Sequence, residues 1–169
     1  LSISILSPVL MAQYQIMLLL SGLVLIIGIV DDMYDIRASV RLLCHSTAAL
    51  AMALFADVKL DTFGELLFSG PIQLGILSLP LTAFATVGVI NAVNMSDGLD
   101  GLSSGLVTIA LGFLSLSALV ADAESVLSFS QLLGVTLIAF LTLNFRMLWK
   151  KSALVYLGDA GSTLLGFML

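Results

Sequence analysis

The chain has 169 residues, of which 60% are hydrophobic and only 10% are charged, and its formal net charge is −5. Soluble globular proteins carry about 25% charged residues, so this composition excludes an ordinary soluble domain, and no basic patch indicates binding to nucleic acid. The single cysteine, Cys44, cannot form an intramolecular disulfide or a thiolate metal cluster, and we expect it to be a buried apolar side chain.

Long uncharged segments dominate the sequence. A helix that crosses a bilayer needs ~20 mostly apolar residues, and in hydrocarbon the backbone must satisfy its own hydrogen bonds, as helices and closed barrels do. The segments lack the alternation of barrel strands. The predicted fold is therefore all-α, a polytopic transmembrane helix bundle in which residues 1–169 form a single integral membrane domain. Four segments contain no Asp, Glu, Lys or Arg: 1–30, 66–96, 101–121 and 125–145.

In chain order, the sequence predicts about five full spans with partial spans at both ends. Residues 1–7 are expected to end one helix, and Pro8 is expected to break it in a turn over residues 7–15. A sixth span is expected to begin at "LGDAGS", residues 157–162. Because both ends of the chain lie in apolar sequence, we expect a fragment of a longer protein. The full spans are predicted at residues 16–30, 38–56, 73–91, 101–120 and 127–145.

Basic residues predict the orientation of these spans. If the spans alternate in direction, Lys59 lies on one side and all other basic residues lie on the opposite side, which the positive-inside rule makes cytoplasmic. The basic residues on the cytoplasmic side are Arg37, Arg41, Arg146, Lys150 and Lys151. The acidic residues at helix ends on that side are Asp31, Asp32, Asp35, Asp97, Asp100 and Asp159. Acidic side chains at a membrane mouth indicate an ion pathway or a functional site.

The first acidic loop, "DDMYD" at residues 31–35, places three carboxylates within five residues. These carboxylates repel one another unless a cation or a basic side chain offsets them, and Arg37 can offset one. Mg²⁺ prefers such hard oxygen ligands. A cation-linked role is therefore predicted, with a solvated loop as the alternative.

The second loop, "NAVNMSDGLDGL" at residues 91–102, is the densest polar stretch. Amides and carboxylates recur there at every third position, so a helix would carry all of them on one broad face. They are Asn91, Asn94, Asp97 and Asp100. Two glycines should loosen that helix and let the backbone approach a ligand. The alternative, an aspartate that caps a helix starting near Leu102, explains only one of the four residues.

The third loop, "LGDAGS", is predicted to open a helix. The free N–H groups at such a helix start could bind an anion, and Asp159 could hold a metal bound to that anion, with helix capping as the alternative. Lys150 and Lys151 could meet phosphates, but the positive-inside rule already explains them. His45 has no second His or Cys nearby, which indicates a packed or interfacial side chain.

Together, "GIVDDMYDIR", "NAVNMSDGLDGL" and "LGDAGSTLLGF", in this order between apolar spans, resemble the polyprenyl-phosphate N-acetylhexosamine-1-phosphate transferase family, glycosyltransferase family 4. The resemblance covers nearly the whole chain. It implies a Mg²⁺-dependent enzyme, with Mn²⁺ as a substitute, that transfers a sugar-1-phosphate from a UDP-sugar to polyprenyl phosphate and releases UMP. Asp35 stands where the muramoyl-pentapeptide branch typically has Lys, which favours the branch that uses N-acetylglucosamine and undecaprenyl phosphate.

The resemblance also implies roles for individual residues. Asp159 is the implied metal ligand, with Asn94 as a second contributor, and Asp97 and Asp100 are implied catalytic residues that line the nucleotide–metal site. The implied substrate-binding residues are Asn91, Asn94, Asp35 and Asn144, the last of which matches a family position near the nucleoside.

Asp31 is the implied general base for the lipid phosphate, with Asp32 beside it as a further catalytic residue. A phosphate monoester has its second pKa near ~6 and is mostly a dianion at neutral pH, so positioning of the lipid phosphate is the alternative role. The family's later histidine-rich cytoplasmic loop would lie beyond Leu169.

The implied location is the cytoplasmic (inner) membrane, with the active site facing the cytoplasm. The implied pathway step is the first membrane step of cell-envelope polysaccharide synthesis, such as that of lipopolysaccharide. The expected partners are the two substrates and membrane lipid, with no nucleic acid and with a homodimer left open. The alternatives are a cation channel or transporter, a phospho-N-acetylmuramoyl-pentapeptide transferase, a CDP-alcohol phosphotransferase and a purely structural membrane subunit.

Overall fold

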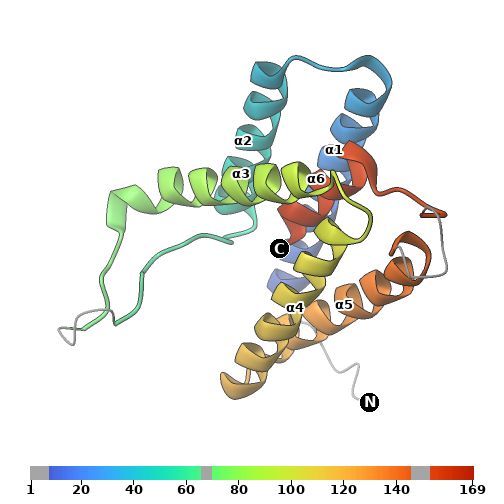
Figure 1. Ribbon diagram of the computed structural model, residues 1–169. Coiled ribbons are helices and arrows are strands. Elements are labelled where there is room, and N and C mark those ends of the chain that lie inside the picture. Colours follow the sequence, from blue (N-terminus) through green and yellow to red (C-terminus); the bar gives the residue numbers. More distant parts are fainter. Residues whose placement is uncertain (1–7, 66–69, 146–152) are drawn as a thin grey trace. The chain divides into compact units, whose positions relative to one another are not determined.

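The computed structural model describes residues 8–65, 70–145 and 153–169, and helices make up most of them (Figure 1). Five of these helices are long and apolar enough to cross a membrane. The predicted all-α, multi-pass membrane fold is therefore confirmed. The elements are α1 (Pro8–Tyr34), α2 (Ala38–Phe55), the 3₁₀ helix η1 (Gly75–Leu77), α3 (Ser78–Ser96), α4 (Leu102–Val120), α5 (Glu124–Asn144) and α6 (Gly158–Met168).

The N-terminal turn predicted over residues 7–15 is wrong, because α1 is already helical from Pro8 onward. Proline is well tolerated at the first position of a helix, since the N–H that it lacks would have no acceptor within the helix there. Pro8 therefore begins a helix where the sequence suggested a break. The helix end predicted for residues 1–7 lies outside the described residues.

The spans at α2, α4 and α5 lie close to their predicted positions, whereas α1 continues to Tyr34, so the prediction of a loop at residues 31–34 is wrong. The span predicted at 73–91 is shifted toward the C-terminus, because η1 precedes it and α3 continues to Ser96. The helix therefore includes Asn91 and Asn94, and the first half of the second polar loop is helical.

The chain forms two compact units, one that ends at Val89 and one that extends from Ile90 to Leu169. In the first unit, α1 and α2 form a hairpin (Figure 1). The buried side chains of α2 are mostly small, among them Ala48, Ala49 and Ala53. Small side chains let helix backbones approach closely in lipid, where no hydrophobic effect drives helices together.

Aspartates in the left-handed backbone region follow three of the helices. Asp35 follows α1 with φ 50°, Asp57 lies just beyond α2 with φ 53°, and Asp122 lies just beyond α4 with φ 52°. Glycine and asparagine are usual at this position after a helix, and aspartate tolerates it better than most residues. Each aspartate thus ends a helical segment by reversing the chain.

The described residues between α2 and η1 include an isolated antiparallel bridge between Thr62 and Gln73. The N–H of Phe63 donates to the carbonyl of Ile72 at 3.1 Å. The loop is tied to α3 by the N–H of Leu60, which donates to the Thr82 hydroxyl oxygen at 2.9 Å. A loop was predicted in this region, and the structure confirms it.

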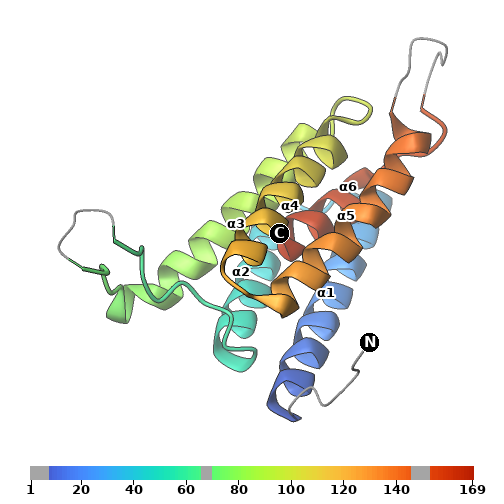
Figure 2. The same cartoon turned by 90° about the horizontal axis from the view of Figure 1, so that it is seen from below.

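In the second unit, α4 and α5 lie side by side (Figures 1 and 2). The core of the unit also takes side chains from the end of α3 and from α6, so the segments that carry the second and third polar loops share one core. The core residues are Val93, Val107, Leu111, Leu137 and Leu165. Within the α4–α5 pair, the hydroxyl groups of Ser115 and Ser130 are 2.8 Å apart and form a hydrogen bond.

The outward faces of the long helices are apolar. Leu19 of α1 is 74% exposed and Phe84 of α3 is 78% exposed, and many other large apolar side chains are exposed as well. Soluble monomers rarely expose apolar surface on this scale. Lipid contact accounts for these faces and agrees with the multi-pass membrane fold.

Candidate functional site

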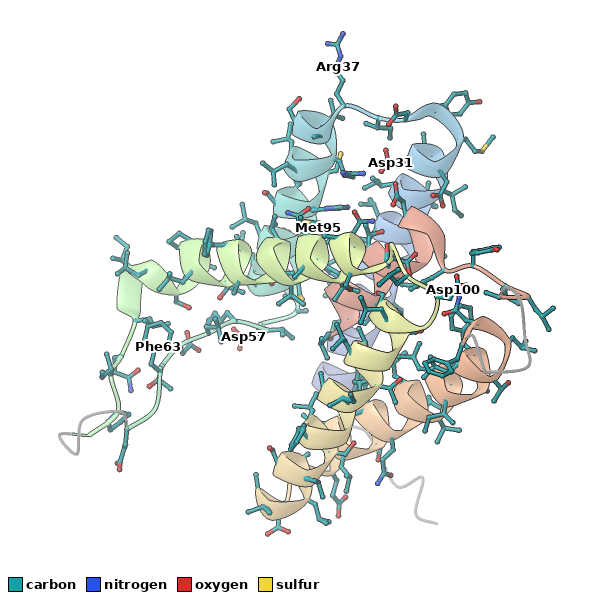
Figure 3. All side chains as sticks on the ribbon, in the orientation of Figure 1. Asp31, Arg37, Asp57, Phe63, Met95 and Asp100 are labelled. Carbon is teal, nitrogen blue, oxygen red and sulfur yellow. The ribbon has the colours of Figure 1, made fainter. Side chains whose placement is uncertain are left out.

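The second polar loop divides into a helical part and a turn. Asn91 and Asn94 lie on α3, which ends at Ser96. Asp97 lies in the turn before α4, as does Asp100 (Figure 3). The prediction that a single helix carries all four residues is therefore wrong for the two aspartates. The helix ends in a tighter turn, in which the N–H of Asp97 donates to the carbonyl of Asn94 at 3.1 Å. Gly101, whose left-handed φ of +78° costs little only for glycine, then leads into α4.

Helix capping does not explain these aspartates. The residue that caps the start of α4 is Gly101, which has no side chain. The alternative in which Asp97 or Asp100 occupies the cap of α4 is therefore wrong. Both aspartates are half-buried.

The two segments that the resemblance linked to a metal are in direct contact. The side-chain amide of Asn94 donates to Oδ1 of Asp159 at 2.7 Å and to the hydroxyl oxygen of Ser162 at 2.9 Å. Asn94 lies near the end of α3, and Asp159 lies in the first turn of α6. The structure thus brings together the two predicted metal ligands, although they are far apart in the sequence.

Ser162 was missed by the sequence reasoning, which treated "LGDAGS" only as a helix start with one aspartate. Its side chain is fully buried, and its hydroxyl donates to the carbonyl of Gly158 at 2.8 Å while its oxygen receives the Asn94 amide. A serine one turn after Asp159 on the same helix face was the available signal. Ser162 fixes the amide of Asn94 against the start of α6.

The start of α6 is packed closely against the side chain of Leu157, which a larger residue at Gly161 would have to displace. A Cβ at Gly161 would lie 2.6 Å from Cδ1 of Leu157. Asp159 lies in the first turn, where the positive end of the helix dipole favours a carboxylate. The predicted helix start at "LGDAGS" is confirmed.

Asn144, predicted to lie near a nucleoside, is buried at the end of α5. Its amide oxygen accepts from the N–H of Gly101 at 2.8 Å, and its amide nitrogen donates to the carbonyl of Val155 at 2.7 Å. The structure therefore places Asn144 between the turn that carries Asp100 and the segment that leads to Asp159.

The first unit holds a second polar group, at the end of the α1–α2 hairpin where residues 35–37 connect the two helices. Asp31 is 4% exposed, lies between the two helices (Figure 3), and forms an ion pair with Arg41 of α2. Its Oδ1 also accepts the N–H of Ile36 at 2.9 Å. Arg37, the basic residue expected to offset one of the acids, is exposed and points away from the hairpin (Figure 3). Arg41, which the sequence reasoning treated only as a topology signal, is the partner of Asp31.

The other residues of this group have different environments. Asp32 and Asp35 are exposed, whereas His45, one turn beyond Arg41 on α2, is 1% exposed. Neither ring nitrogen of His45 has a hydrogen-bond partner among the residues that the structure describes. A packed side chain was predicted for His45, and its burial agrees with that. The predicted basic loop with Arg146, Lys150 and Lys151 lies outside the described residues.

The donor atoms of the second unit suit one kind of metal site. Among the described residues, no group of three or more His, Cys, Asp or Glu side chains could hold a metal ion by itself. Mg²⁺, however, is usually held by one or two carboxylates together with water and substrate phosphates. The carboxylate of Asp159 and the amide oxygen of Asn94 are oxygen donors of the type that such a site uses.

Comparison with known proteins places the chain among transferases. The sequence profile of Glycosyl transferase family 4 matches residues 14–169. A probable undecaprenyl-phosphate N-acetylglucosaminyl 1-phosphate transferase of Bacillus subtilis (strain 168) is 33% identical over 147 residues, which are 87% of this chain and 39% of that protein. The undecaprenyl-phosphate alpha-N-acetylglucosaminyl 1-phosphate transferase of Yersinia pestis is 31% identical over 155 residues, 92% of this chain and 42% of that protein.

The protein of the same description from Escherichia coli (strain K12) is 31% identical over 147 residues, 87% of this chain and 40% of that protein. The chain thus spans about two-fifths of the length of the curated relatives that it matches. The family profile covers both the α1–α2 group around Asp31 and the contact between Asn94 and Asp159. The chain belongs to glycosyl transferase family 4.

Proposed function

We propose that the whole protein transfers N-acetylglucosamine-1-phosphate from UDP-N-acetylglucosamine to undecaprenyl phosphate or a similar polyprenyl phosphate and releases UMP. The reaction would be the first membrane step of cell-envelope polysaccharide synthesis, on the cytoplasmic face of the cytoplasmic membrane. The contact of Asn94 with Asp159 and Ser162 carries the proposal, because it joins two motif segments at one point. The names of the relatives support undecaprenyl phosphate as the acceptor and N-acetylglucosamine 1-phosphate as the group transferred.

The acidic side chains suit this chemistry only together with a cation. A carboxylate repels a diphosphate, so Asp159 would hold Mg²⁺, with Asn94 as a second ligand and Mn²⁺ as a substitute. When bound, Mg²⁺ neutralises the diphosphate and stabilises the UMP that leaves. Asp97 and Asp100 would flank the nucleotide from the turn before α4.

The bond changes follow from the substrates. An oxygen of the lipid phosphate attacks the phosphorus that carries the sugar, and the bond from that phosphorus to the bridging oxygen breaks. The bridging oxygen leaves with UMP, and the lipid product is a diphosphate that carries the sugar. Catalysis then depends mainly on holding the two phosphates in line, since the protein has little covalent chemistry to perform.

The surroundings of Asp31 favour positioning over proton abstraction. Its carboxylate is engaged by Arg41 and by the N–H of Ile36, so its oxygens already have hydrogen-bond donors. The lipid phosphate is mostly a dianion at neutral pH and has little need of a base. Asp31 would then order the connected end of the α1–α2 hairpin and place Arg41, while Asp32, on the last turn of α1, and Asp35, just after it, are exposed.

The proposal is tested by UMP release in membranes that contain the full-length protein. We expect Mg²⁺-dependent release with UDP-N-acetylglucosamine and at least 100-fold slower release with UDP-N-acetylmuramoyl-pentapeptide. Asp159→Asn should lower the rate at least 100-fold at 1 mM Mg²⁺ and recover in part at high Mg²⁺, because a neutral ligand holds the metal less well. The matched control is Asp122→Asn in the turn between α4 and α5, which should keep the wild-type rate.

Two results would refute the proposal. A wild-type protein that releases no UMP with any polyprenyl phosphate would exclude the transferase activity. A normal rate for Asp159→Asn at low Mg²⁺ would exclude Asp159 as a metal ligand.

A further inference from the structure

The end of α5 is hydrogen-bonded to both segments that carry the candidate site. Asn144, the last residue of α5, is 4% exposed. Its Oδ1 accepts from the N–H of Gly101 at 2.8 Å and from the hydroxyl of Ser104 at 3.4 Å. Its Nδ2 donates to the carbonyl of Val155 at 2.7 Å. One buried side chain therefore joins the start of α4 to the segment before α6.

These bonds lie beside the acidic residues of the site. Gly101 directly follows Asp100 (Figure 3), and Val155 lies shortly before Asp159. The backbone gives the second segment a further tie to α5, because the N–H of Leu154 donates to the carbonyl of Leu143 at 3.0 Å. The end of α5 thus fixes the positions of the turn that carries Asp100 and of the segment that leads to Asp159.

Steric contact limits the same spacing. A Cβ on Gly101 would lie 2.4 Å from Cδ2 of Phe145 and 3.3 Å from its Cα. The backbone of Gly101 therefore passes directly against the residue that follows Asn144. A hydrogen bond holds the turn at Gly101 against the end of α5, and van der Waals contact with Phe145 keeps the two segments from moving closer.

The bonding capacity of Asn144 is nearly used. An amide oxygen has two lone pairs and an amide nitrogen has two hydrogens. Gly101 and Ser104 take both lone pairs, and the carbonyl of Val155 takes one hydrogen. A nucleoside contact would have to displace one of these bonds or use the last N–H.

We infer that Asn144 is a positioning residue, which holds the turn with Asp100 and the segment with Asp159 at the spacing that phosphoryl transfer needs, without contact to the nucleoside. The inference rests on the proposed function. It accounts for the burial of this asparagine and for the engagement of both ends of its amide.

The kinetic test separates positioning from substrate contact in the full-length protein. For Asn144→Leu we expect kcat to fall about 100-fold, since a misplacement of about 1 Å can cost that factor, while the KM for UDP-N-acetylglucosamine stays within about 2-fold. Asn144→Asp keeps the acceptor for Gly101 and Ser104 and loses the donor to Val155, so its kcat should lie between those of Asn144→Leu and wild type. Gln131→Leu, an exposed amide on the same helix, is the matched control and should behave as wild type.

A distance measurement tests the same inference without turnover. Spin labels on cysteines at Leu99 and Tyr156, both exposed, report the spacing of the two segments by electron paramagnetic resonance. The wild-type background and the Gln131→Leu control should give one narrow distance distribution. Asn144→Leu should give a broad or shifted one.

Three outcomes would overturn the inference. One is a KM that rises 10-fold or more in Asn144→Leu with kcat unchanged, which would indicate nucleoside contact. Another is a loss of folded protein with normal kcat per folded molecule, which would indicate a purely structural residue. The third is an unchanged distance distribution. A wild-type protein without transferase activity would refute the proposed function instead, and the distance measurement would still decide the role of Asn144.

Discussion

Asp31 receives hydrogen bonds from Ile36 and Arg41, five and ten residues later in the chain, whereas Asp159 receives its bond from Asn94, 65 residues earlier. The first arrangement needs only the short connection between α1 and α2. The second needs α4 and α5 to be folded, because they separate the two partners in sequence and pack against both. Carboxylates of the same kind are therefore held by local geometry in one unit and by tertiary structure in the other.

The largest effect on stability should come from the local arrangement. Arg41→Met would leave the buried carboxylate of Asp31 without its cation, which we expect to lower the free energy of unfolding by about 3 kcal/mol. The measurement is denaturant unfolding of the full-length protein in mild detergent. Arg37→Met, which removes an exposed arginine just before the start of α2, should change the free energy of unfolding by less than about 0.5 kcal/mol.

The double variant Asp31→Asn/Arg41→Met sharpens this comparison. Since it removes both charges, it should recover at least half of the lost stability. A double variant that is less stable than Arg41→Met would mean that Asp31 is held by something other than the arginine.

A smaller loss of stability is expected at Gly101, whose backbone packs closely against Phe145 at the end of α5. Gly101→Ala forces alanine into a left-handed conformation and against Phe145, and we expect it to lower the free energy of unfolding by about 2 kcal/mol. Phe145→Ala in the same molecule should relieve the collision but not the backbone strain, so about 1 kcal/mol of the loss should remain. If the second substitution restores nothing, the two residues are not in contact.

The smallest effect is expected in the loop after α2, where Lys59 and Asp57 form an ion pair at the protein surface. Lys59 donates to the carboxylate of Asp57 at 2.8 Å, and this hydrogen bond, with the charges of Asp57 and Asp61, raises the pKa of Lys59 above its ordinary value. A raised lysine pKa contributes stability below the ordinary lysine pKa and loses it as the pH rises through the raised value.

Asp57→Asn should therefore return the pKa of Lys59 toward its ordinary value, as followed by NMR of the lysine side chain. Solvent screening should keep the accompanying change in unfolding free energy below detection between pH 6 and 9. A clear loss of stability in that range would show that the Lys59–Asp57 pair stabilises the fold, as we expect of the buried pair of Asp31 and Arg41.

The sequence predicts the helices well because composition alone selects them. Uncharged apolar segments have few alternatives in a bilayer, so the spans at α2, α4 and α5 lie close to their predicted bounds. Pro8 was misread because a proline fits the start of a helix as well as a break between helices. The shift of α3 has a similar cause, since its last turns are polar and were taken for a loop.

The site was predictable in its residue types but not in its pairings. The periodicity of three suggested one helical face for Asn91, Asn94, Asp97 and Asp100, but α3 ends at Ser96, and the two aspartates lie in the turn that leads through the left-handed Gly101 into α4. No local sequence pattern indicates that Asn94 forms a hydrogen bond with Ser162, or that Asp31 forms an ion pair with Arg41 and not with Arg37, which is nearer in the sequence. Those choices depend on helix packing, which brings partners together according to the fold.

The three left-handed aspartates limit how far their helices can slide across the bilayer. Asp35, Asp57 and Asp122 each lie within two residues of the end of an apolar helix, at the point where the chain reverses. A carboxylate drawn toward the bilayer centre costs about 2.5–3.5 kcal/mol, so a shift of α1, α2 or α4 along the membrane normal would be opposed by its own terminal charge. The position of each helix along the membrane normal is therefore set by the charge and by the turn geometry of one residue. Asparagine at these positions would keep the backbone preference and remove the charge.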